Sequence, residues 1–303
     1  MTTHIEPAAP PVAPPTRVPP VTTRRTARRP RRWVPSPRVV ILLFVTVLSA
    51  FPLYFMLVMA SRPNDDITSV PPPLTPGSEL MTNVQRVLEN EDVMFQQAVI
   101  NSLLVSLVAT VCVVLFSAMA GFAFAKLRFI GRQPLLAFVL ATMMVPVQLG
   151  LIPLYMLMSK IHLAGTLPAV TLPFLVTGFG IFMVRQYVIQ AVPDELLDAA
   201  KMDGASIPRT FLFVVLPLLR PILAVLALLT FMERWNDFLW PFLVLDLEHP
   251  TVQVALSRLA GGYYTDQALV MAGTLLGVVP LLIVFILFGR QIVGGIMEGG
   301  LKQ

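Results

Sequence analysis

The sequence predicts an all-α integral membrane protein with six membrane-spanning helices. Hydrophobic residues make up 56% of the 303 residues, charged residues make up only 13%, and the mean hydropathy is +0.76. Soluble domains carry about 25% charged residues. Apolar runs of about 20 residues, the length that crosses a bilayer, recur along the chain. A large soluble protein with buried helices is disfavoured, because a soluble core helix need not be apolar all round over such a length.

Residues 1–37 form a separate segment. They hold ten prolines and seven arginines, including the run RRTARRPRR, but a single acid, Glu6. Such a segment cannot bury enough apolar surface to fold, so we expect a disordered basic tail. No small-residue cleavage site closes the apolar run that follows, which argues against a signal peptide. Beside a membrane span, a basic tail is better suited to anionic lipid than to nucleic acid, and we expect lipid contact and no nucleic acid.

Six apolar segments follow the tail, and 38–303 is predicted to be one transmembrane domain. Their approximate bounds are 38–60, 98–125, 134–158, 167–188, 212–245 and 268–290. Each can cross a hydrocarbon core about 30 Å thick as a helix rising 1.5 Å per residue. The third and fourth segments contain Pro146, Pro153, Pro168, Pro173, Gly150, Gly178 and Gly180. Interrupted helices are typical of a transport pathway or a moving joint, although kinking for packing explains any single proline equally well.

The distribution of lysine and arginine predicts the orientation. Basic residues collect in the tail, in the 126–132 loop, in the polar stretch at 193–211 and near the C-terminus, whereas 61–97 carries two arginines against six acids. The basic segments fall on one side of the membrane if six spans alternate, and the positive-inside rule makes that side cytoplasmic. We therefore expect a multi-pass protein of the inner or plasma membrane with both termini in the cytoplasm.

Several kinds of chemistry are disfavoured by what the chain contains. Its single cysteine, Cys112, allows no internal disulfide and is expected to be a packing residue. The three histidines, His4, His162 and His249, are far apart and predict no metal site. The chain has no GxxxxGK[ST] motif for cradling a nucleotide phosphate. We expect neither an enzyme nor a cofactor bound to this chain.

The stretch PDELLDAAKMDGASIPRTF, residues 193–211, is polar within this apolar chain. Pro193 suits a first helical position, and the acids Asp194 and Glu195 suit the first turn. Gly204 is placed to end the helix in a left-handed conformation, and Ser206 to cap the next helix. The residues alone leave two alternatives open: a small-faced helix that docks into a groove on another protein, or a solvated loop with helical character.

The segment DAAKMDGA, Asp198 to Ala205, resembles the cytoplasmic signature of permease subunits of binding-protein-dependent ABC importers. That signature is Glu-Ala-Ala, three residues, then Gly, and Asp198 stands where the family has glutamate. The segments NSLLVS, AGFAFAKLRFIGR, MMVPVQLGLIPLY, WNDFLWP and GGIMEGGLKQ, in this order, are similar to the carbohydrate-uptake branch, and most of all to the second permease of the maltose importer. The resemblance covers 38–303 and leaves the tail outside.

This resemblance implies the ABC importer permease fold and a coupling loop at 189–211. The residues that it places against a cytoplasmic ATPase are Glu195, Asp198, Ala199, Ala200, Asp203 and Gly204, with a lesser role for Glu298 to Gln303 in the C-terminal tail, 291–303. It implies four partners: a homologous second permease, two ATPase subunits that bind ATP and Mg, and an extracytoplasmic solute-binding protein. The chain would form half of the pathway for a sugar or related solute. A polyol phosphate such as glycerol 3-phosphate is an alternative solute, and a stand-alone channel or ion-driven transporter is the alternative class.

The stretch FMERWNDFLWP places charged and aromatic residues together in the fifth span. Ionisable groups at membrane depth cost about 2.5–3.5 kcal/mol each on insertion scales and usually face a cavity or a partner. Aromatic faces beside hydrogen-bonding side chains also suit sugars. We therefore predict that Trp235, Asn236 and Asp237 line the substrate pathway. An interfacial aromatic belt, or polar contact with the sister permease, would account for the same residues.

Overall fold

The computed structural model describes residues 36–261 and 265–300. The chain divides into two compact units, Met1–Ser49 and Ala50–Gln303, each described by itself. In the first unit, the described residues form the start of helix α1 (Pro37–Ala60), where the Thr46 hydroxyl donates to the Leu42 carbonyl at 2.8 Å. The basic tail predicted for 1–37 lies outside the described residues apart from its last two positions.

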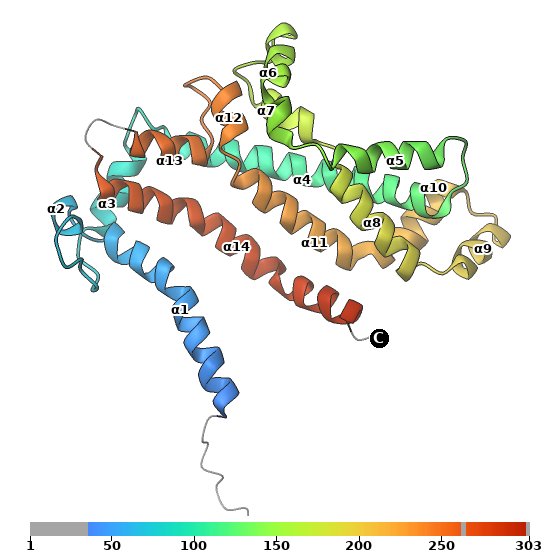
Figure 1. Cartoon of the computed structure of the whole chain (residues 1–303), viewed down its shortest axis with the longest axis horizontal. Coiled ribbons are helices and arrows are strands. Elements are labelled where there is room, and N and C mark those ends of the chain that lie inside the picture. Colours follow the sequence, from blue (N-terminus) through green and yellow to red (C-terminus); the bar gives the residue numbers. More distant parts are fainter. Residues whose placement is uncertain (1–35, 262–264, 301–303) are drawn as a thin grey trace, which may run out of the picture. The chain divides into compact units, whose positions relative to one another are not determined.

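The second unit is built from helices and short helical turns (Figure 1). After α1 come α2 (Asn64–Ile67), α3 (Leu80–Leu88), α4 (Phe95–Lys126), α5 (Arg132–Thr142), η1 (Val147–Gly150), α6 (Leu151–Lys160), α7 (Leu167–Thr171), η2 (Leu172–Phe174), α8 (Gly178–Ala191), α9 (Asp194–Met202), α10 (Ile207–Thr210), η3 (Phe211–Val215), α11 (Leu216–Trp235), α12 (Leu239–Val244), α13 (Val252–Ala260) and α14 (Gln267–Gly300). Within the described ranges, five helical segments are long and apolar enough to cross a membrane, and one bent pair brings the number to six. The prediction of an all-α membrane fold is confirmed.

The third predicted span is not one continuous helix. Its two parts, Arg132–Thr142 and Val147–Lys160, meet at an angle of 92°. The break spans residues 143–146 and ends at Pro146, which disfavours helical backbone in the residue before it. The fourth span is likewise interrupted between η2 and α8, where the Thr177 side chain accepts from the Gly180 amide and caps the start of α8.

The fifth span ends earlier than the sequence predicts. The continuous helical segment runs over Ile207–Trp235, so the predicted end at 245 is wrong. Asn236 ends the helix, since its side-chain amide donates to the Met232 carbonyl at 2.8 Å. The first part of the same span widens into the π-helical turn η3, which ends two residues before Pro217, whose ring nitrogen cannot donate to the carbonyl four residues back.

Helices α4 and α11 form the centre of the second unit and pack against each other. At one end of this pair lies a buried group that we name the Trp235 cluster: Ala60, Val87, Val93, Phe95, Ala98, Phe231, Trp235, Val252, Ala255, Leu259 and Ala272. At the other end lies the Val215 cluster: Val113, Ala118, Phe122, Val184, Val188, Val192, Leu197, Phe211, Val215, Leu219 and Leu226. The Val215 cluster joins α9 to α4, α8 and α11.

Helix α8 crosses α4 at close range because both helices carry glycine at the crossing. A Cβ atom on Gly121 would lie 2.7 Å from a Val184 methyl and 2.9 Å from the Arg185 amide nitrogen, and one on Gly180 would lie 2.3 Å from the Ser117 hydroxyl. Small residues at helix crossings are the usual means of bringing membrane helices together. The last helix, α14, continues through most of the predicted C-terminal tail, and residues beyond Gly300 lie outside the description.

Candidate functional site

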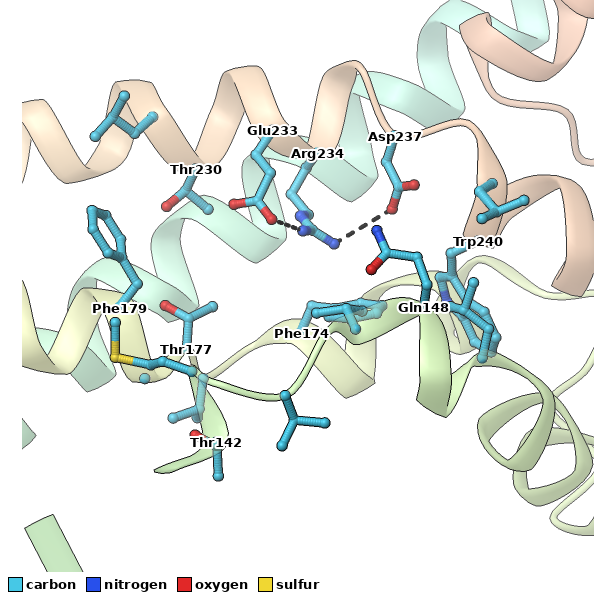
Figure 2. Close-up of a pocket in the computed structure, with 18 of the residues that line it drawn as sticks. Thr142, Gln148, Phe174, Thr177, Phe179, Thr230, Glu233, Arg234, Asp237 and Trp240 are labelled. Atoms are coloured by element: carbon cyan, nitrogen blue, oxygen red, sulfur yellow. Dashed lines mark hydrogen bonds and ion pairs between the residues drawn. The ribbon is translucent and has the colours of Figure 1, made fainter. Parts of the chain in front are cut away.

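A cavity of about 670 Å³ lies where the three interrupted spans meet (Figure 2). One wall is the break of the third span, from Thr142 to Leu151, and a second is the break of the fourth, from Phe174 to Phe179. The third wall is the end of the fifth span, from Leu226 to Trp240. The helix interruptions that the prolines predict therefore line one common space.

Arg234 is the central charged group of this cavity (Figure 2). Its guanidinium pairs with the Glu233 carboxylate and lies 3.5 Å from Asp237 Oδ2. The same guanidinium lies over the Phe174 ring, 4.6 Å from its centroid. The Arg234 side chain is 11% exposed, whereas that of Glu233 is 64% exposed. One formal positive charge and two formal negative charges leave this triad with a sum of minus one.

The cavity also offers neutral hydrogen-bonding groups and aromatic faces. Within the described part of the chain, the side chains of Gln148 and Thr230 make no hydrogen bond to protein, although Thr230 is only 5% exposed. Trp240 is anchored by its indole, which donates to the Ala169 carbonyl at 3.2 Å, and it packs edge-on against Phe174. Free amide and hydroxyl groups beside aromatic rings suit a ligand with both hydroxyl groups and apolar faces.

The structure separates the three predicted pathway residues. Asp237 lines the cavity. Trp235 lies in the Trp235 cluster, 1% exposed, stacks on Phe231 and donates from its indole to the Gly277 carbonyl at 3.1 Å. Asn236 caps the end of α11. Neither Trp235 nor Asn236 is a lining residue of this cavity, and the packing of each explains its place in the sequence.

Helical periodicity identifies the residues that the sequence analysis missed. Leu226, Leu229, Thr230, Glu233 and Arg234 recur at helical spacing on one side of α11 and line the cavity, and Asp237 lines it from just beyond the end of that helix. Trp235 stands about 100° away from Arg234 on the same helix. A prediction based on one face of the helix would have identified these residues in place of the three consecutive residues 235–237. Gln148 and Phe174 come from other spans and carried no such signal.

The polar stretch forms helix α9 and a tight turn, as the sequence predicts. Asp194 and Glu195 stand in the first turn, although Pro193 is the residue before the helix and not its first member. Gly204 has φ +74°, its amide donates to the Lys201 carbonyl at 2.9 Å, and the Ala205 amide donates to the Ala200 carbonyl at 2.9 Å. These two bonds are the Schellman pattern that ends a helix at a left-handed residue.

Helix α9 has distinct inner and outer faces. Leu197 and Ala200 are buried, and Leu197 belongs to the Val215 cluster. The exposed face carries Glu195, Asp198, Ala199 and Met202, spaced at i, i+3, i+4 and i+7, and Asp203 follows at the end of the helix. The Met202 side chain is 89% exposed. Of the residues predicted to couple to an ATPase, Ala200 therefore faces the chain's own core.

Two ion pairs involve α9. Lys201 Nζ lies 2.9 Å from Asp198 Oδ1, with both side chains at least 70% exposed. Lys126 Nζ lies 2.7 Å from Asp194 Oδ1, and this hydrogen bond and charge lower the pKa of Asp194 below its ordinary value. Elsewhere in the described ranges, no three His, Cys, Asp or Glu side chains are grouped so that they could hold a metal ion.

Comparison with known proteins decides the family. Residues 114–293 match the model of the binding-protein-dependent transport system inner membrane component family. The chain is a member of this family. The permease is 34% identical to the arabinooligosaccharides transport system permease protein AraQ of Halalkalibacterium halodurans, over 86% of this chain and 93% of that protein. It is 34% identical to the lactose transport system permease protein LacG of Rhizobium radiobacter, over 86% and 94%.

Two further relatives bear on solute and fold. The permease is 31% identical to the sn-glycerol-3-phosphate transport system permease protein UgpE of Pectobacterium atrosepticum, over 85% of this chain and 94% of that protein. A bacterial ABC transporter involved in the import of the acidic polysaccharide alginate shares the fold, with a TM-score of 0.73 over 84% of this chain and 94% of that one at 23% identity. The permease is thus a multi-pass membrane subunit of a binding-protein-dependent ABC importer.

Proposed function

We propose that the permease carries a neutral sugar or oligosaccharide, and that the cavity at the three interrupted spans is its half of the passage. The cavity combines the Arg234 triad with the free side chains of Gln148 and Thr230 and with the aromatic rings of Phe174 and Trp240. Sugars present hydroxyl groups at their rims and apolar C–H faces, which match these two kinds of group. The relatives named for arabino-oligosaccharides and lactose support this solute class.

The charge of the triad is the observation that favours a neutral solute over a polyol phosphate. Arg234 already faces two carboxylates, Glu233 and Asp237, so its charge is offset before any solute arrives. A phosphate monoester with close to two negative charges would meet a net negative site. Arginine and lysine bind phosphate through charge-assisted hydrogen bonds, and the carboxylates of Glu233 and Asp237 would compete for those of Arg234. Although one relative is named for glycerol phosphate, the cavity here fits an uncharged ligand better.

Coupling to ATP hydrolysis is proposed to run through α9. Its exposed stripe of Glu195, Asp198, Ala199 and Met202 would dock in a groove of an ATPase subunit, with Met202 filling an apolar pocket between the acids. ATP and Mg would be bound by that partner. The buried face gives the mechanical link, because Leu197 packs in the cluster that reaches Leu226 in the cavity wall. Closure of the ATPase pair would thereby bias the two states of the pathway.

The remaining partners and the orientation follow from exposed surfaces and charge. Apolar side chains beside the cavity, including Val145, Val147 and Val176, are more than half exposed, which leaves a surface for a homologous second permease. A second ATPase subunit would serve that sister permease, and an extracytoplasmic binding protein would deliver the solute. The excess of Lys and Arg on the α9 side supports a cytoplasmic position for α9 and both termini.

Uptake by the complete complex in proteoliposomes tests the proposal. Lactose, an arabino-oligosaccharide and sn-glycerol 3-phosphate are offered with their cognate binding protein, with ATP inside the vesicles. We expect ATP-dependent uptake of a neutral sugar, and a loss of about tenfold in Thr230→Val, which removes one hydrogen bond to the solute. Uptake of only the phosphate ester would overturn the solute class. Transport by the permease alone, without ATPase or ATP, would instead show a stand-alone channel or ion-driven transporter.

A further inference from the structure

An ion pair joins α9 to a helix that is not its neighbour in the chain. Lys126, the last residue of α4, lies 2.7 Å from the carboxylate of Asp194, the first residue of α9. Only 11% of the Lys126 side chain is exposed, whereas 78% of the Asp194 side chain is exposed. A lysine with so little exposure needs a partner, because a buried charge without one is strongly unfavourable. Lys126 is therefore held in place by Asp194.

Both charges also stand where the helix dipoles favour them. Lys126 is at the C-terminal end of α4, which attracts cations, and Asp194 is in the first turn of α9, which attracts anions. Lys126 is the largest influence that lowers the pKa of Asp194. The pair thus aligns the end of one helix with the start of another, and its geometry depends on both helices.

The connections of α9 show what this pair adds. Along the chain, α9 is joined to α8 through residues 192 and 193 and to the fifth span through the turn at Gly204. Helix α4 is joined to neither end of α9, yet it packs along α8 and α11 and carries Val105 into the cluster around Trp240 at the cavity. The Lys126–Asp194 pair is the described ion pair that ties α9 to α4. The other ion pair of α9, between Lys201 and Asp198, stays within the helix.

We propose that the Lys126–Asp194 pair is a transmission contact that makes α4 follow α9, with Lys126 as a positioning residue. This inference rests on the proposed role of α9 as the coupling helix. Movement of α9 would then reach the cavity by two routes: one through the Gly204 turn and the packing of Leu197 in the Val215 cluster, and one through the ion pair, which adds a charged contact with the end of α4. The second route needs no change in the residues that face the ATPase, since Lys126 lies outside the exposed stripe of α9.

The test measures how many solute molecules enter per ATP hydrolysed by the reconstituted complex. In Lys126→Met and in Asp194→Asn we expect this ratio to fall about two- to thirtyfold, the range by which residues along a coupling route change coupling. ATP hydrolysis should continue, so that ATP is consumed with less transport. The exchanged pair Lys126→Asp with Asp194→Lys should recover part of the ratio, because the contact is restored although both charges now oppose the helix dipoles.

Lys160→Met is the matched control. Lys160 is also the last residue of a helix, α6, but it is exposed and makes no ion pair among the described residues, so the ratio should not change. The Asp194 side chain is exposed, so Asp194→Asn should fold normally. An unchanged ratio of solute to ATP in this variant would overturn the inference. The inference would also be overturned if the exchanged pair had a ratio no higher than that of the single variants. If the wild-type complex transports without ATP hydrolysis, the proposed function itself fails, and that result is seen before any variant is made.

Discussion

The α9 turn and the cavity are both polar regions in an apolar chain, but they are built in opposite ways. Helix α9 is one continuous stretch of 9 residues with its charges exposed, and its shape comes from contacts between residues close in sequence. The cavity draws its polar groups from three spans and holds Arg234 at 11% exposure between two acids and an aromatic ring. The proposed docking helix is thus built from local contacts, whereas the proposed passage is built from residues that tertiary packing brings together. Substitutions in the two regions should therefore impair transport in different ways.

The largest effect is expected at the α9 turn, from Gly204→Pro. Proline cannot adopt the φ of +74° found here, and it removes the amide that donates to the Lys201 carbonyl. The penalty is about 3 kcal/mol or more, a factor of about 100 in the population of the native turn. ATP-driven uptake should fall by a similar factor while insertion into the membrane, followed by protease protection of the loops, is retained. Gly204→Asn, which tolerates this conformation, should keep most transport. Normal uptake in the proline variant would refute the link through this turn.

Arg234→Met probes the cavity end and should have the next largest effect. It leaves Glu233 and Asp237 facing each other without a cation. Because Glu233 is 64% exposed, the loss is smaller than for a fully buried pair, and we expect about 1–3 kcal/mol, or about five- to 150-fold in uptake. Coupling should survive, so that solute-stimulated ATP hydrolysis falls together with uptake. The double variant Arg234→Met, Asp237→Asn should recover part of the uptake. If the double variant takes up solute no faster than Arg234→Met alone, Arg234 has no electrostatic role.

Gly121→Val tests the helix crossing that supports both regions. The added side chain would meet Val184 and the backbone at Arg185, and overpacking of this kind costs about 1–3 kcal/mol. We expect a lower melting temperature of the purified complex and a reduced yield of assembled permease. Gly150→Ala serves as the control, because nothing lies within 4 Å of its added Cβ and its φ is −90°. Equal melting temperatures for the two variants would show that the α4–α8 crossing has room to relax.

The smallest effect is the pH dependence of the Asp194 contact. The pKa of Asp194 is lowered by Lys126, so the ionised form is favoured in the folded chain. Its contribution to stability is complete above the ordinary value of 3.8 and is lost as the pH falls through the lower folded value. The difference in melting temperature between wild type and Asp194→Asn should thus be constant from pH 7 to pH 5 and shrink below about pH 4. A difference that instead grows on acidification would contradict this sign.

Features that depend on residues close together in the sequence could be predicted. The acids at the start of α9 and the left-handed Gly204 follow from rules that act over a few residues, and the span count follows from apolar length. The direction in which Ala200 faces was not predictable, because it is set by how α9 packs on the rest of the chain: Ala200 is buried on the same face as Leu197, which belongs to the Val215 cluster. Its small size suggested docking, whereas the structure buries it against the chain itself.

The cavity was only partly predictable, for a physical reason. Prolines indicate where a helix breaks, but not the angle of the break or which breaks meet. Asp237 was predicted to face the pathway and it does line the cavity, whereas Trp235 was chosen for its chemistry and is instead buried beside Gly277. Gln148 shares the cavity with Arg234 because the third span bends, and Phe174 shares it because the fourth span is interrupted. Residue type alone does not carry that information.

The 92° bend between α5 and α6 also bears on whether the cavity beside it would be hydrated. At membrane depth, backbone amides and carbonyls outside a regular helix are tolerated where protein covers them or where they face water. The cavity beside this bend would hold water that bonds to these groups before any solute enters. An arriving sugar then exchanges its hydroxyls for this water, and such an exchange yields little net free energy. If this cavity is the passage, as proposed, we expect it to retain a solute only briefly, and tight, selective capture would then belong to the extracytoplasmic binding protein.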